Sequence, residues 1–146
     1  MVAIFIYIFI SFGNIRATLI VLLPVVVGSV WTVGVMDLMK VSFNLANLVI
    51  LPLIIGIGVV NGVHMVHRYR EETDKSVNIL SRSTGKGVVL SSLTTMIGFG
   101  SLMIADYQGI YSLGLVLTLG VGCCLLASIT VLPSILRLCA VKGWNL

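Results

Sequence analysis

The chain has 146 residues, of which 58% are hydrophobic and only 10% are charged, and its mean hydropathy is +1.15. A soluble domain carries roughly 25% charged residues, so this chain cannot cover itself with polar side chains, and membrane lipids are expected to contact it. The formal net charge of +4 does not indicate a nucleic-acid partner, because the basic residues stand at the ends of apolar runs, where membrane topology explains them.

Four apolar segments are long enough to cross a bilayer, which takes about 20 residues. They are residues 17–36, 45–66, 88–105 and 110–132, the last of which is expected to end at Pro133. A fifth run, residues 1–12, is too short to span by itself. The sequence therefore predicts an all-α, polytopic transmembrane bundle of about five helices, the first truncated, in one domain over residues 1–146. The short first run also predicts that the chain is a piece of a longer protein.

The basic residues predict an orientation. If the segments alternate across the membrane and the polar loop 67–87 is cytoplasmic, eight of the nine Lys and Arg residues fall on the cytoplasmic side and only Lys40 falls outside. The positive-inside rule then places the N-terminus outside or on the periplasmic side and the C-terminus in the cytoplasm. Residues 71–86 have a weak apolar face, which fits either an interfacial helix or a solvated connector.

The third segment combines small residues with polar ones. Gly58 and Gly62 form a GxxxG pair that lets helices approach closely. Asn61 shares a helix face with Gly58, and His64 lies beside that face. Polar groups inside a membrane usually point into a bundle or a cavity. Two interpretations stay open at this point, either helix–helix contacts or part of a transport pathway. His64 and His67 lack a third ligand nearby, so no metal site is expected.

The fourth segment begins with a hydroxyl cluster of Ser91, Ser92, Thr94 and Thr95, and Gly98 follows broadly on the same side as Ser91, Thr94 and Thr95. Such a face permits close packing, and its hydroxyls could also relay protons. The sequence contains no P-loop, no catalytic triad spacing and no paired carboxylates, and no Asp or Glu lies inside a full spanning segment. We therefore expect neither an enzyme nor a cofactor, and we expect the three cysteines to be packing residues.

Two stretches carry a more specific signal. They are GIGVVNGVHMVHRYREE (56–72) and SSLTTMIGFGSLMIADYQGIYSLGLVLTLGVG (91–122), the latter followed by LPSIL (132–136). Together they resemble the C-terminal transmembrane region of the RND superfamily, in particular the MMPL-type lipid exporters, and most of all the hopanoid-biosynthesis-associated RND transporters. The resemblance implies the last five helices of a duplicated six-helix unit, whose N-terminal half would be the partner, with proton flux driving export of lipids or other hydrophobic substrates.

The resemblance also implies roles for single residues. MMPL-type proteins often have an Asp-Tyr pair where this chain has Val60 and Asn61, so Asn61 could at most hydrogen-bond to an acid on a partner helix. Thr94 or Thr95 falls where relatives place a relay hydroxyl. The cytoplasmic motif comprises Arg68, Tyr69, Arg70 and Glu71, and the resemblance implies that the chain lies in a bacterial inner (plasma) membrane. A sterol-sensing or protein-export-helper module of the same superfamily is the alternative, and a homo-oligomer stays open.

Overall fold

The computed structural model describes residues 6, 13, 15–41, 45–71 and 84–141. Its elements are α2 (Ile15–Leu38), α3 (Leu45–Glu71), α4 (Thr84–Gly100), the short 3₁₀ helix η1 (Ser101–Ile104) and α5 (Gln108–Val141). The predicted run 1–12 and the central part of the predicted loop, 72–83, lie outside the described residues, so neither the truncated first helix nor the interfacial helix is tested.

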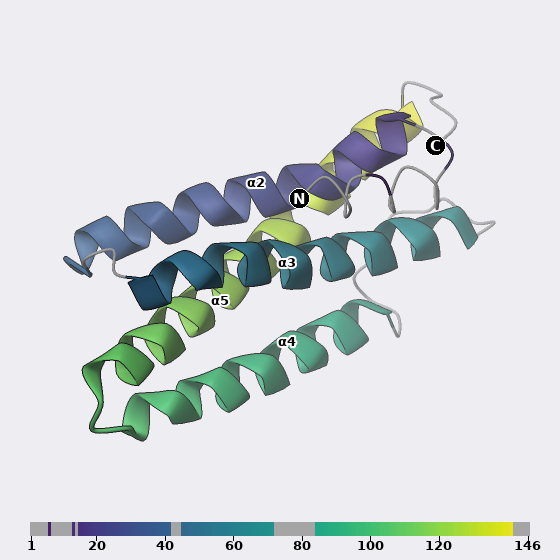
Figure 1. Cartoon of the computed structure of the whole chain (residues 1–146). Helices are drawn as coiled ribbons and strands as arrows, with labels where there is room; N and C mark the ends of the chain where they lie inside the picture. Colours follow the sequence, from purple (N-terminus) through teal and green to yellow (C-terminus); the bar gives the residue numbers. More distant parts are fainter. Residues whose placement is uncertain (1–5, 7–12, 14, 42–44, 72–83, 142–146) are drawn as a thin grey trace.

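The described part of the chain is helical throughout and contains four helices that are long and apolar enough to cross a membrane. This confirms the predicted fold class, a helical bundle, and makes the protein a multi-pass membrane protein. Figure 1 shows the four helices lying roughly along a common direction, with successive helices running in opposite directions. The starts of α2 and α4 and the ends of α3 and α5 therefore meet at one end of the bundle.

Helix boundaries differ most from the expected segments on both sides of the predicted loop and at Pro133. Residues 67–71 continue α3 and residues 84–87 begin α4, so both flanks of the predicted loop are helical. The expected end of the last segment at Pro133 is wrong, because α5 passes through this buried proline to Val141. Proline is tolerated inside membrane helices where neighbouring groups take up the freed backbone contacts, and buried Leu132 and Leu136 hold both flanks of Pro133 in the core.

Helix α5 is the centre of the bundle, and α2, α3 and α4 all pack against it. It closely approaches two neighbours at Cys124, where the backbones of α2 and α3 present Gly28 and Gly58. A Cβ placed on Gly28 would lie 2.7 Å from Cys124 Cα, and one on Gly58 would lie 3.2 Å from Cys124 Sγ. Small residues therefore set the distance between three helices at this crossing.

The turn after α2 is fixed by backbone hydrogen bonds. Lys40 N donates to Asp37 O and Val41 N donates to Met36 O, with distances of 3.0 and 2.9 Å. This pair of bonds forms a Schellman motif, whose left-handed position is usually glycine. Here Lys40 holds that position with φ of 54°, and α2 ends there before the chain turns into α3.

Candidate functional site

The candidate site begins with a hydrogen bond between α3 and α4, two helices that pack more loosely on each other than either does on α5. Asn61 Nδ2 donates to Ser92 Oγ at 3.1 Å, and the two side chains are only 5% and 2% exposed. A buried amide is costly unless it is paired, so the hydroxyl of Ser92 is what allows Asn61 to stay inside the bundle. Sequence reasoning placed Ser92 in the hydroxyl cluster without assigning it a role.

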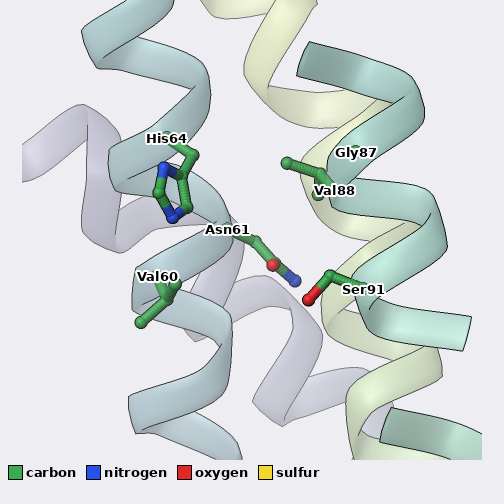
Figure 2. A pocket seen from close by; sticks show the side chains of 6 residues that line it. All are labelled: Val60, Asn61, His64, Gly87, Val88 and Ser91. Atoms are coloured by element: carbon green, nitrogen blue, oxygen red, sulfur yellow. The ribbon is translucent and has the colours of Figure 1, made fainter. Parts of the chain in front are cut away.

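A cavity of about 240 Å³ lies beside this hydrogen bond. Its lining comes from one face of α3 and one face of α4, and consists of Val60, Asn61, His64, Gly87, Val88 and Ser91. Figure 2 shows Asn61 reaching from α3 toward α4, with His64 further along α3 and Ser91 on the opposite wall. Asn61 and Val88 are buried, whereas the other lining residues are exposed, so the cavity opens onto the surface of the bundle.

The cavity lies close to one end of the spanning helices. His64 is three residues before the end of the span Val49–His67, and Gly87 is two residues after the start of the span Gly85–Ile104. At 1.5 Å per residue, these offsets correspond to roughly 3–5 Å of depth. This is the end of the bundle at which most basic residues of the sequence gather, which we predict to be cytoplasmic.

Comparison with known proteins identifies the family of the chain. The family model described as "MMPL family" matches residues 1–145. The chain belongs to the MMPL family. The chain is 32% identical over 142 residues to a membrane protein of Methanocaldococcus jannaschii, an alignment that covers 93% of this chain and 37% of that protein.

Two further relatives are named for an activity. The chain is 31% identical over 122 residues to the hopanoid transporter HpnN of Burkholderia multivorans and 30% identical over 119 residues to HpnN of Rhodopseudomonas palustris. These alignments cover 84% and 82% of this chain but only 13% of each transporter. No solved structure matches the chain significantly. The chain thus corresponds to a small part of the curated relatives that it matches.

In this MMPL-family chain, the two threonines expected as relay residues bond to their own helix. Thr94 Oγ1 donates to Leu90 O and Thr95 Oγ1 donates to Ser91 O, both at 2.9 Å. Thr94 is exposed and Thr95 is half-buried. The hydroxyl that meets Asn61 belongs to Ser92 instead. Any role of Thr94 and Thr95 in proton transfer therefore stays a prediction.

The three glycines singled out for packing have different surroundings. Gly58 lies at the Cys124 crossing, and a Cβ on Gly62 would lie 2.8 Å from Val21 O, so both sit where α3 meets its neighbours. Gly98 is exposed, and a Cβ there would meet nothing within 4 Å. Three further close approaches, at Gly28, Gly114 and Gly120, were not singled out from the sequence. Isolated glycines in α2 and α5 lacked the GxxxG spacing that drew notice to α3.

The remaining candidates lie at the end of α3. Arg68, Tyr69, Arg70 and Glu71 form its last turn, and their side chains lie outside the described part of the structure. His64 and His67 are both exposed. No group of three His, Cys, Asp or Glu side chains within the described residues could hold a metal ion.

Proposed function

We propose that the chain is the C-terminal membrane module of a proton-driven RND/MMPL-type transporter that exports a lipid or another hydrophobic substrate, such as a hopanoid. Membership in the MMPL family and the similarity to two hopanoid transporters support a transport role rather than an enzymatic one. The observation that carries the proposal is the buried amide of Asn61, which lines a cavity on a membrane helix. Polar groups at such positions commonly mark transport pathways.

The proposed mechanism needs an acid from outside this chain. Within the four described spans the acid is Asp37, which is exposed and lies one residue before the end of the span Ala17–Leu38, whereas proton-driven transport normally uses a carboxyl group inside the membrane. The side of α3 that carries Val49, Leu53, Val60 and His64 is exposed. A helix of the N-terminal half packed there would bring its carboxyl group beside Asn61, whose amide would hydrogen-bond to the carboxyl group and help to fix its orientation.

The proposed setting is the plasma membrane, with the end of the bundle near residues 71 and 84 in the cytoplasm. The N-terminal half of the transporter and the membrane lipids are the proposed partners. The charge distribution supports this orientation, since Lys40 lies at the opposite end, beyond α2. A non-exporting sensing module of the same superfamily remains the alternative that the following experiment addresses.

The test replaces Asn61 in the full-length transporter. Asn61→Leu removes the amide while keeping the side-chain size, and we expect the rate of proton-coupled lipid export from inverted vesicles to fall by about tenfold or more, as for loss of one hydrogen bond to a charged group. Thr130→Val is the matched control, because Thr130 is exposed on α5 and bonds only to Leu126 O within its own helix. Export at the wild-type rate by a well-expressed Asn61→Leu protein would reduce Asn61 to a packing residue.

A further inference from the structure

In the chain by itself, before any helix of the proposed N-terminal half packs on α3, the cavity between α3 and α4 is accessible to lipid from the side. Only 11% of the span formed by α4 and η1 is buried within the bundle, and four of the six lining residues, Val60, His64, Gly87 and Ser91, are exposed. The cavity extends from roughly 3 Å inside the end of the spanning segments, at Gly87, to roughly 10 Å, at Val60, so it reaches from the headgroup boundary into the acyl-chain region. A lipid of the adjacent leaflet can therefore reach it without crossing the hydrocarbon core.

The lining combines hydrogen-bond donors with apolar walls. His64 contributes an imidazole N–H, Ser91 a hydroxyl and Asn61 an amide whose NH₂ group has two hydrogens, one of which is directed at Ser92 Oγ. Val60 and Val88 supply the apolar part, and no carboxylate is present in the lining. The volume of about 240 Å³ holds considerably more than one water molecule. This lining fits a group that accepts several hydrogen bonds and is joined to an apolar body.

The charges around the cavity favour an anionic group. By sequence, residues 67–87, which join α3 to α4 at the cavity end, carry five basic residues against three acids, Glu71, Glu72 and Asp74. The opposite end of the bundle carries Lys40 against two acids, Asp37 and Asp106. Basic sites between membrane helices on the cytoplasmic side bind anionic lipid headgroups. The difference between the two ends makes the cavity end the one suited to such a lipid.

We propose that this cavity is a binding site for the phosphate headgroup of an anionic phospholipid, with His64, Asn61 and Ser91 as donors to the phosphate oxygens. The acyl chains would lie outside, against the exposed apolar surface of the bundle. Because the readout is lipid retention, the site is tested independently of whether the module transports anything. The shared chemistry is a phosphate anion, which could belong to a lipid or to a soluble phosphate.

The experiment measures lipid retained by the full chain, purified and delipidated in detergent. The protein is incubated with mixed micelles of phosphatidylglycerol or of phosphatidylcholine with the same acyl chains, and bound lipid is counted by native mass spectrometry. We expect preferential retention of phosphatidylglycerol, and a drop of about tenfold in its apparent affinity for His64→Leu, as for one hydrogen bond to a charged group. Inorganic phosphate and glycerol 3-phosphate are added as soluble competitors, and they should not displace the lipid.

A pair of glycine variants distinguishes cavity filling from general damage. Gly87→Leu introduces a side chain into the cavity, and Gly34→Leu introduces the same side chain into α2; a Cβ at either glycine meets nothing within 4 Å. Both proteins should keep their helix content by circular dichroism, and only Gly87→Leu should lose phosphatidylglycerol. Equal retention of both lipids, unchanged retention in Gly87→Leu and His64→Leu, or displacement by the soluble phosphates would overturn the lipid assignment.

Discussion

Helices α4 and α5 are joined by a short connection, yet they occupy very different places in the bundle. Both are apolar enough to cross a membrane, with mean hydropathies of 1.7 and 2.4 over their spans. Only 11% of the first span is buried within the bundle, whereas 56% of the second is. Overall apolarity therefore decides that a segment enters the membrane, but the contacts of its individual faces decide whether it forms the core or the edge.

The exposed side of α4 is neither purely apolar nor in need of polar partners. Ser91, Thr94 and Gly98 lie on it, and Thr94 bonds back to Leu90 O of its own helix. Such a surface can face lipid where a hydroxyl, like that of Thr94, bonds to its own helix. It can also accept the close approach of a further helix, because its side chains are small. The edge position of α4 is thus compatible with a larger assembly.

The largest effect should come from the core crossing. Gly28→Leu places a Cβ 2.7 Å from Cys124 Cα, so the backbones of α2 and α5 must separate, and we expect a loss of about 3 kcal/mol of stability from overpacking. Gly98→Leu on α4 meets open space and should change stability by no more than about 0.5 kcal/mol. Titration with SDS, followed by circular dichroism, measures both. Similar stabilities for the two variants would remove the distinction between core and edge.

A smaller effect on stability is expected at the contact between α4, the helix at the edge of the bundle, and α3. A double-mutant cycle with Asn61→Ala and Ser92→Ala should give a coupling free energy of about 0.6 kcal/mol, the average for hydrogen bonds between membrane helices. The bond of 3.1 Å is the polar link between these two helices in the described part of the structure. A coupling of zero would show that the two side chains are not paired in the membrane, and that α4 is held by α5 alone.

The smallest effect is expected on the open face of α4. Thr94→Val keeps the side-chain shape and removes a hydroxyl that bonds only to Leu90 O among the described contacts, so the stability of the isolated chain should change by less than about 0.5 kcal/mol. The same SDS titration provides the measurement. A larger loss would mean that Thr94 already has a partner in the bundle, and α4 would then not be an edge helix.

The sequence was sufficient for the parts of the fold that depend on apolar length. The four spans predicted from residues 17–36, 45–66, 88–105 and 110–132 each correspond to one helical element or to α4 with η1. The continuation of α5 past Pro133 was missed because the sequence shows only the local effects of a proline, which are the loss of one hydrogen-bond donor and a steric clash. It does not show the neighbouring groups that compensate for these effects.

The site could be predicted only in part, for a geometric reason. Antiparallel neighbours joined by a loop bring residues at equal distances from its centre to the same depth, and Asn61 and Ser92 are such a pair. Which hydroxyl faces Asn61 depends on how α4 is rotated about its axis, and one residue corresponds to about 100° of rotation. Sequence reasoning therefore reached the hydroxyl cluster but favoured Thr94 and Thr95, while the structure pairs Asn61 with Ser92.

The crossing of Gly28, Gly58 and Cys124 has a mechanical consequence. Backbones in near contact at one point leave α2, α3 and α5 little freedom to slide past one another, so they form the stiff part of the bundle. Helix α4 is held equally tightly near its C-terminal end, where a Cβ on Gly114 would lie 2.7 Å from Phe99 O, but at Gly122 it offers only the flexible end of Met96. We therefore expect the spacing between α4 and α3 to change more easily than the spacing of α2, α3 and α5.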